Sequence, residues 1–286
     1  MAKKIFLDFK PYPRYKNCFV NNEACDWLEK ENSTVSHYMP YTRLEEWVEK
    51  SVMTFVSPSK WDDPFEKIYL GSTLLNLPLL KKYTSPQIAC LCFTKKQFKD
   101  SVAFWNSFKT DESTQLVRVQ FDLKKLVNQL AKILEKKKLN IYIAAVDYSL
   151  LQNSIKNKKK FISCIIEKSQ NKEIDAESFY MKMLSCKRKA FAFEEEIRIM
   201  LVPQTQIRKN ILDKDDCYLV KMDFQPIVQK IWLEPIRLPA GWVSEDFAKE
   251  RIKKLQDKIQ QSQLYEKQQK CSEIDFSKIL TTKKSG

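Results

Sequence analysis

The residues best suited to chemistry are three consecutive carboxylates, Glu194 to Glu196, followed by Arg198 within an otherwise apolar stretch. If this stretch is a strand, its period of two places Glu194, Glu196 and Arg198 on one face. Two carboxylates so close repel each other, which raises at least one pKa and suits the pair to acid/base catalysis or to gripping hydroxyl groups. If the stretch ends a helix instead, Glu194 and Arg198 form an ordinary i,i+4 ion pair on a solvated face.

Glycine and histidine are too rare for several common kinds of active site. The chain of 286 residues contains three glycines, which almost excludes a glycine-rich phosphate-binding loop, and it holds neither a Walker motif nor G-x-G-x-x-G. Its one histidine, His37, removes most histidine-based metal sites. A Ser-His-Asp triad would have to use that same residue. We therefore expect no metal and no phosphate loop.

The chain is strongly basic, with 50 Lys and Arg against 36 Asp and Glu and a formal net charge of +14. Such a charge attracts polyanions, nucleic acids above all. The densest basic run contains Lys156, Lys158, Lys159 and Lys160 and falls on a predicted helix. A solvated helix face and an RNA or DNA contact both account for this run, and steeply salt-dependent nucleic-acid binding would favour the contact.

The cysteines and the hydropathy pattern indicate the compartment. Eight cysteines are scattered without C-x-x-C spacing, which predicts free thiols in a reducing environment. No signal peptide is recognisable before the fold, and no apolar run approaches the length that spans a bilayer. We therefore expect a cytoplasmic protein without a membrane-spanning segment.

The periodicity of apolar residues predicts about six or seven short strands among five or six helices, without regular βαβ order. This pattern favours an α+β fold with a mixed or antiparallel central sheet of short strands flanked by helices. We expect an irregular or partly helical lead-in over residues 1–35, a single α+β domain over 36–240, and a C-terminal helix and loose tail over 241–286.

Strands are expected at 53–57, 88–94, 116–121, 141–146, 188–201, 217–223 and 227–232. Helices are expected at 43–52, from 100 onward, and at 123–138, 149–170, 175–187 and 244–270. In the strand at 116–121, alternation predicts that Arg118 and Gln120 point outward. The last helix carries a narrow apolar stripe, which could dock on the body of the protein or on a protein partner.

Several stretches of the chain follow one another in an order that carries a family resemblance. They are Tyr38 to Leu44; Phe55, Ser57-Pro58 and Asp62 to Glu66; Cys92 to Thr94; Trp105 with Val117 to Asp122; Lys187, Phe191 and Phe193 to Arg198; and Ile227 to Pro235. The first three stretches resemble, in turn, an opening tyrosine-arginine motif, a strand followed by N-D-P-F-E, and the motif C-F-S. The last three resemble W-x-x-Y followed by a strand, a block with K, W and E-x-E-x-R, and a closing strand. These are motifs of the bacterial domain-of-unknown-function family DUF2971, and the resemblance covers residues 36 to 236.

The chain departs from this family at a few positions. Asp62 stands where asparagine is usual, Phe191 where tryptophan is usual, and Ser107-Phe108 where a His-Tyr pair often occurs. A glycine that usually precedes the strand at Val117 is absent. If the histidine of that pair is catalytic in relatives, this chain needs another route.

The order of the motifs also looks like the three-part NAD-binding pattern of ADP-ribosyltransferases. The resemblance implies that Glu196 grips a ribose hydroxyl and stabilises an oxocarbenium ion, while Glu194 activates the acceptor. It further implies an NAD-binding set made of His37, Tyr41, Arg43, Thr94 and Arg198. The expected function is that of an NAD-dependent ADP-ribosyltransferase or NAD glycohydrolase, in a toxin or phage-defence effector.

Two other classes of function stay open at this point. The first is a non-catalytic sensing or nucleic-acid-binding component of a defence system, in which Glu194, Glu196 and Arg198 form a structural ion network. The second is a metal-dependent nuclease that uses Glu194 and Glu196 with Asp62, Asp63 and Glu66. Acidic residues in a turn such as the one at Asp62 more often cap the turn than bind a metal.

Overall fold

The computed structural model describes residues 9–61, 88–95, 102–109, 115–151, 181–204, 211–213 and 215–234, together with residues 250 and 253. These residues form an α+β fold with a mixed, mostly antiparallel sheet, which confirms the predicted α+β class and the predicted kind of sheet. They fall into two compact units. The first lies within Met1–Ser33, Thr54–Lys96 and Val127–Val220, and the second within Thr34–Met53, Gln97–Leu126 and Lys221–Gly286.

The first unit is built on strands in the order β1-β2-β7-β10-β5, with β4 pairing with β5 and β11. The strands are β1 (Phe9–Pro11), β2 (Cys18–Asn21), β4 (Val52–Val56), β5 (Ala89–Thr94), β7 (Leu139–Ala145), β10 (Glu196–Pro203) and β11 (Cys217–Lys221). Strand β10 pairs antiparallel with β5 and β7, whereas β2 pairs parallel with β7. The first seven residues of β10 are all buried, because other elements pack on both faces of the sheet at this strand.

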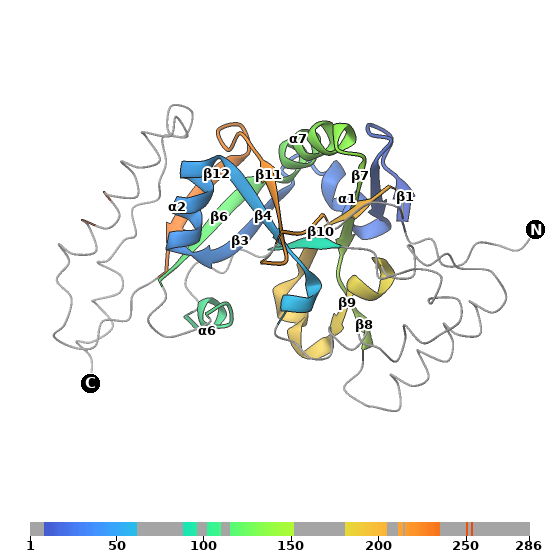
Figure 1. The fold of residues 1–286 in the computed structure, drawn as a ribbon. Helices are drawn as coiled ribbons and strands as arrows, with labels where there is room; N and C mark the ends of the chain where they lie inside the picture. Colours follow the sequence, from blue (N-terminus) through green and yellow to red (C-terminus); the bar gives the residue numbers. More distant parts are fainter. Residues whose placement is uncertain are drawn as a thin grey trace, which may run out of the picture. The chain divides into compact units, whose positions relative to one another are not determined.

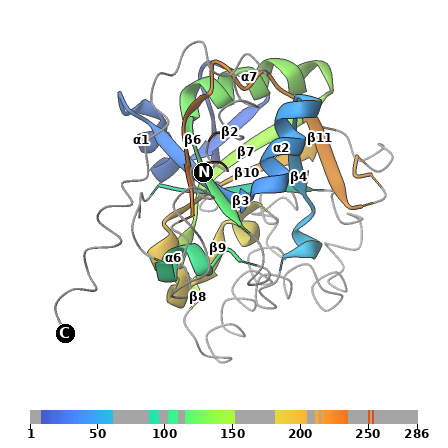
Figure 2. The same cartoon turned by 90° about the vertical axis from the view of Figure 1, so that its left-hand side faces the viewer.

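Helices and a second small sheet cover the two faces of β7 and β10. Helix α7 (Leu123–Lys136) presents an apolar stripe that includes the fully buried Leu130 and Leu134. Asn17 ties this helix to β7, because its side-chain amide donates to the carbonyls of Ala131 and Leu139 at 3.2 Å each. In both views α7 lies on one side of β7 and β10 (Figure 1, Figure 2), and the parallel pair β8 (Asp147–Leu151) and β9 (Cys186–Arg188) lies on the other.

Three short helical elements complete the first unit. Helix α1 spans Asn22–Glu29, the 3-10 helix η1 spans Pro58–Lys60, and the 3-10 helix η2 spans Lys189–Glu194. Helix η2 leads directly into β10 and so places the acidic residues of the sequence against the sheet.

The second unit has β6 (Leu116–Asp122) between two antiparallel neighbours, β3 (Thr34–Pro40) and β12 (Val228–Leu233). Its helices are α2 (Tyr41–Lys50) and α6 (Val102–Asn106). A buried cluster of Tyr38, Phe104, Trp105 and Leu116 forms part of its core, with edge-on and stacked ring contacts around Tyr38.

The structure corrects the predicted strand at 188–201. Cys186–Arg188 form β9, Lys189–Glu194 coil into η2, and only Glu196–Pro203 continue as a strand. The break occurs at Glu195, whose φ of 43° is left-handed. Glu194 and Glu196 therefore do not share a strand face, and Glu194 and Arg198 do not form a helical i,i+4 pair.

Other boundaries also differ from the sequence prediction. The expected irregular lead-in contains helix α1 but also strands β1 and β2, which were missed because they are only three and four residues long. Residues 186 and 187, expected at the end of a helix, belong to β9, and the region expected to be helical from 149 begins within β8. Arg118 and Gln120 are buried, so the prediction that they point outward is wrong.

Several predicted features lie outside the described residues. They are the turn from Asp62 to Glu66, the basic run with Lys156, Lys158, Lys159 and Lys160, and the C-terminal helix apart from residues 250 and 253. Across the described part of the chain, no helix has the length and apolarity needed to cross a bilayer.

Candidate functional site

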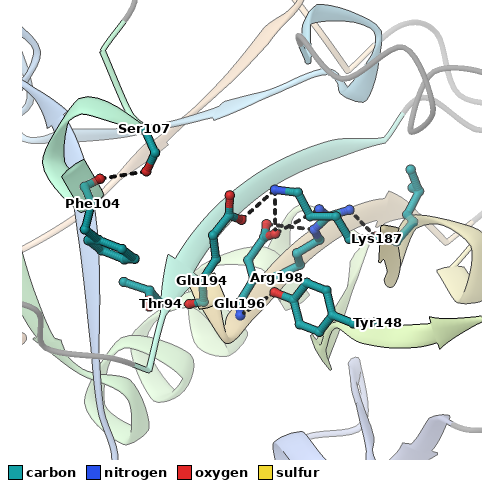
Figure 3. A network of polar contacts seen from close by, with 9 residues as sticks. Thr94, Phe104, Ser107, Tyr148, Lys187, Glu194, Glu196 and Arg198 are labelled. Atoms are coloured by element: carbon teal, nitrogen blue, oxygen red, sulfur yellow. Dashed lines mark hydrogen bonds and ion pairs between the residues drawn. The ribbon is translucent and has the colours of Figure 1, made fainter. Parts of the chain in front are cut away.

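Four charged side chains of the first unit meet where η2 turns into β10. Lys187 comes from β9, Glu194 from the end of η2, and Glu196 and Arg198 from the start of β10 (Figure 3). Glu196 and Arg198 are two residues apart on one strand, so both project from the face that β9 covers. We call these four residues the charged cluster.

The carboxylate of Glu196 and the guanidinium of Arg198 form a two-pronged ion pair. Arg198 Nε donates to Glu196 Oε1 at 2.8 Å, and Arg198 Nη2 donates to Glu196 Oε2 at 2.9 Å. Glu196 is 5% exposed and Arg198 is 1% exposed. Such planar fork-to-fork pairs fix orientation as well as charge, so the Glu196 carboxylate is held in one position.

The remaining surroundings of Arg198 also satisfy its buried charge. Its Nη1 donates to the carbonyl of Leu184 at 2.6 Å. Its guanidinium carbon lies 4.3 Å from the ring centroid of Trp61, which follows η1. The cation therefore has a carboxylate, a carbonyl and an aromatic face as partners, which offsets the cost of burying it.

Lys187 joins the two carboxylates of the charged cluster. Its Nζ lies 2.6 Å from Glu194 Oε2 and 3.3 Å from Glu196 Oε2. It also lies 4.8 Å from the ring centroid of Phe191 in η2. The two acids that sequence periodicity placed on one strand thus meet through a lysine instead.

The left-handed turn at Glu195 is held by β5. The Thr94 hydroxyl donates to the carbonyl of Glu194, and the backbone amide of Lys95 donates to the carbonyl of Glu195 at 3.1 Å. Thr94 is the antiparallel register partner of Glu196. Thr94 therefore acts here by fixing the backbone that carries the acids.

The two carboxylates have opposite pKa shifts. Burial opposes ionisation of Glu196, but the charges of Arg198 and Lys187 outweigh it and lower the pKa of Glu196 to about 2. Burial raises the pKa of Glu194, with a further increase from the charge of Glu196 and a partial offset from Lys187. Pairs of acids whose surroundings separate their pKa values in this way are typical of acid/base sites.

Tyr148 of β8 contacts the acidic strand through its hydroxyl group. The backbone N–H of Glu196 donates to the Tyr148 oxygen at 2.9 Å. Burial, together with the charge of Glu196, raises the pKa of Tyr148, so the phenol keeps its proton at neutral pH. Burial and the same carboxylate also raise the pKa of the Cys92 thiol, which is the register partner of Arg198 on β5.

A polar cavity of about 660 Å³ lies beside the charged cluster, entirely within the first unit. Its walls carry four acidic residues and two lysines, with the amides of Asn21 and Asn22 and the Tyr148 ring between them. The charged residues on the walls are Glu23, Lys95, Asp147, Lys182, Glu195 and Glu196. This volume is in the range of small-molecule pockets, which run from about 300 to 1,000 Å³.

The structure brings together only part of the predicted site. Thr94, Glu194, Glu196 and Arg198 cluster in the first unit, as described above. The other predicted NAD-binding residues, His37, Tyr41 and Arg43, belong to the second unit.

In the second unit, these three residues have local roles. His37 stacks on Trp47, with ring centroids 5.7 Å apart. Tyr41 begins α2, and its backbone amide donates to the carbonyl of Gln115 at 2.9 Å. Arg43 forms an exposed pair with Glu46 at 3.9 Å.

Most residues that line the cavity were not predicted as site residues, and neither was Lys187 of the charged cluster; the lysines and the tyrosine among them are Lys95, Tyr148, Lys182 and Lys187. Lys95 and Tyr148 each follow closely after a strand end, where functional side chains often lie, so the chain carried a weak signal for them. Lys187 was noted only as the lysine of the K, W and E-x-E-x-R block, without a role, and Lys182 gave no signal because it is one lysine among many.

Within the described ranges, no cluster of three or more His, Cys, Asp or Glu side chains is arranged to hold a metal ion. The six cysteines found there are free thiols. No family model, curated protein or solved structure was found to match this chain.

Proposed function

We propose that this chain cleaves the N-glycosidic bond of NAD, either as a glycohydrolase or as an ADP-ribosyltransferase. The observation that supports this function best concerns Glu196, which is one of the residues lining a polar cavity of about 660 Å³ and whose buried, ionised carboxylate is held in place by Arg198. A carboxylate held this way needs no reorganisation to stabilise positive charge that develops beside it.

The chemistry requires few parts. The bond between ribose C1′ and the nicotinamide nitrogen breaks, and its electron pair goes to the nitrogen, which neutralises the pyridinium. The sugar becomes an oxocarbenium ion, and Glu196 stabilises it electrostatically. The oxygen of water or of an acceptor then bonds to C1′ and releases a proton, so the products are nicotinamide and ADP-ribose, free or attached.

Glu194 is the proposed proton acceptor. Its raised pKa makes it a stronger base than an ordinary carboxylate, and Lys187 holds it near Glu196. The two acids then have different tasks, since Glu196 stays ionised throughout while Glu194 gains and loses a proton.

Wider context supports the same proposal. The order of Thr94 on one strand and Glu196 on its antiparallel neighbour agrees with the ADP-ribosyltransferase-like motif order in the sequence. On the order of the sequence motifs we also propose membership of the DUF2971 family and a role as a toxin or phage-defence effector, and on the free cysteines a cytoplasmic location.

The experiment is a calorimetric titration of NAD into the wild type and Glu196→Gln, followed by mass spectrometry of released nicotinamide. Both proteins should bind NAD, and only the wild type should release nicotinamide at an appreciable rate. The rate of nicotinamide release should fall about a hundredfold or more in Glu196→Gln, because the variant lacks one charge that stabilises the transition state. Equal release by both proteins would rule out the assigned role of Glu196.

Two further variants separate chemistry from folding. Glu46→Gln removes a carboxylate from an exposed ion pair with Lys50 and should release nicotinamide as the wild type does. Glu196→Asp keeps a charge opposite Arg198 but withdraws it by one methylene, so it should fold even where Glu196→Gln does not. Circular dichroism spectra and melting curves of all four proteins show whether a lost rate reflects a lost fold.

A second candidate is a non-catalytic module that binds nucleic acid. The ion pairs within the charged cluster favour this candidate. The two carboxylates and the two cations of the cluster pair with each other, as they do in a structural ion network. The net charge of +14 agrees with it. RNA or DNA binding that weakens steeply with salt, without nicotinamide release, would favour this candidate.

A further inference from the structure

The cavity beside the charged cluster has two lysines on its walls that the proposed chemistry does not use. Lys95 follows β5, and its Nζ lies 2.5 Å from Glu23 Oε1. Lys182 precedes β9, and its Nζ lies 3.5 Å from Asp147 Oδ2. All four of these residues line the cavity.

Each lysine is more deeply placed than its acidic partner. The side chains of Lys95 and Lys182 are 14% and 15% exposed, whereas those of Glu23 and Asp147 are 63% and 32% exposed. The acids can therefore rotate toward water at little cost, and the lysines stay at the wall. Water reaches both pairs and screens them, so each contributes little stability and another anion can replace the carboxylate.

The indole of Trp27 limits how far Lys95 can move. The Lys95 Nζ lies 5.7 Å from the centroid of the Trp27 ring, on which Lys30 also packs at 4.3 Å. Helix α1, which carries Trp27, begins at the cavity wall with Asn22 and Glu23, so the positive end of its dipole adds a small field of the same sign.

The charges on the walls suit a ligand that carries both signs. Glu195 and Glu196 are acidic wall residues, and Glu196 also belongs to the charged cluster, whereas Lys95 and Lys182 are basic wall residues. A nicotinamide dinucleotide has a cationic ring at one end and a diphosphate further along. A neutral sugar or a simple anion would leave one of these two sets without a complementary group.

We propose that Lys95 and Lys182 bind the diphosphate of a dinucleotide ligand whose reactive end lies at Glu196. Phosphate oxygens accept charge-assisted hydrogen bonds from lysine, and they would displace the carboxylates of Glu23 and Asp147. This inference rests on the proposed function for the identity of the reactive end, but the diphosphate contact itself does not.

The test compares Lys95→Met and Lys182→Met with Lys30→Met. Methionine keeps most of the aliphatic length and removes the charge. Lys30 is an exposed lysine on the same Trp27 ring, so its variant controls for net charge and for the indole contact. The measurements are calorimetric affinities for ADP-ribose and for inorganic pyrophosphate, and KM values for NAD and for nicotinamide riboside, which lacks the diphosphate.

Lys95→Met and Lys182→Met should each weaken ADP-ribose and pyrophosphate binding about tenfold, the loss of one charge-assisted contact. KM should rise by a larger factor for NAD than for nicotinamide riboside, and Lys30→Met should resemble the wild type. Unchanged affinity in both lysine variants, or an equal loss in Lys30→Met, would overturn the proposal.

The outcomes also separate this inference from the proposed function. If no protein releases nicotinamide but the two lysine variants bind ADP-ribose more weakly than Lys30→Met, the diphosphate site stands and the assigned reaction is wrong. If the wild type releases nicotinamide and the lysine variants bind ADP-ribose as tightly as it does, the reaction stands and the diphosphate site is wrong.

Discussion

At the scale of single residues, Arg198 determines the state of Glu196. A buried carboxylate without a cation would take up a proton, because burial disfavours its charge. The fork of Arg198 supplies two hydrogen bonds and a full positive charge, and it keeps Glu196 ionised. The same contacts hold the Glu196 carboxylate in one position, so a ligand has to bind within contact distance of that position.

Arg198→Met should therefore destabilise the protein strongly, because it leaves the Glu196 charge buried without its main partner. Loss of one partner of a buried pair costs about 3 to 5 kcal/mol. The matched control is Arg43→Met, since the exposed pair of Arg43 and Glu46 spans 3.9 Å. Such surface pairs contribute about 1 kcal/mol or less. Urea unfolding of both variants measures the difference, and similar losses would contradict the assigned burial of the Arg198 pair.

Glu196 should also make stability depend on pH. Its pKa falls from 4.5 to about 2 on folding, so its ionised form stabilises the fold above the unfolded pKa. This stabilisation is lost as the pH falls from about 4.5 toward 2, and it amounts to about 3 kcal/mol at most. Glu194, whose pKa is raised, acts in the opposite direction and reduces the net slope.

Denaturant unfolding from neutral pH to about pH 3 checks this dependence. The wild type should lose stability on acidification, and Glu196→Gln should lose less over the same interval because it has no carboxylate to protonate. Parallel pH curves for the two proteins would show that Glu196 is not the group responsible.

The sequence predicted the members of this site better than their geometry. Glu194, Glu196 and Arg198 were singled out by residue type and spacing, and Thr94 was named through the resemblance to the ADP-ribosyltransferase motif order. The strand assigned across Glu194 was wrong because Glu195 adopts a left-handed conformation that favours glycine or asparagine, and nothing in its side chain signals it. The position of Lys187 depends on the pairing of β9 with β8. These two strands lie far apart in the sequence, so no local sequence pattern indicates that they pair.

At the scale of elements, Asn21 connects α1 to the central strands. Its side-chain oxygen accepts from the amide of Ala24 at 2.9 Å, which caps α1, and from the amide of Ala145 at 3.1 Å. Its side-chain nitrogen donates to the Ala145 carbonyl at 2.9 Å. One side chain therefore fixes both the start of α1 and the end of β7, at the wall of the cavity.

Asn21→Ala should cost about 2 to 3 kcal/mol, the sum of a lost cap and two lost bonds to β7. Asp122→Ala is the control, because Asp122 Oδ1 accepts from the amide of Lys125 at 3.0 Å at the start of α7. A lost cap of this kind costs about 1 kcal/mol. Thermal and urea unfolding of both variants give the comparison, and an equal cost would mean that the bonds to Ala145 add nothing.

Strongly periodic elements were predicted well, but the seven-residue strand β3 and the shortest strands were missed. The stripe of α7 and the alternation of β5 and β6 lie within two residues of their predicted ranges. Strands β1, β2 and β9 contain three or four residues each, too few to show a period. Arg118 was predicted to face outward, but its strand lies between two others and its guanidinium packs 3.5 Å from the Trp232 ring centroid.

At the scale of the whole molecule, the amino-acid composition excludes some kinds of active site but does not identify the reaction. Three glycines and one histidine leave carboxylates, lysines and arginines as the main groups for catalysis and binding. The site described above is built from those residue types. A net charge of +14 is compatible both with a phosphate-bearing small ligand and with nucleic acid, so charge alone does not choose between the two candidate functions.

The most direct measurement is single-turnover release of nicotinamide, with the protein in excess over NAD. This design needs no knowledge of the acceptor, because glycohydrolase and transferase reactions both release nicotinamide in the first step. The wild type should convert bound NAD completely, and Glu196→Asp, whose fold is checked by circular dichroism, should do so about a hundredfold more slowly. No release by the wild type, or equal rates in the two proteins, would contradict the account.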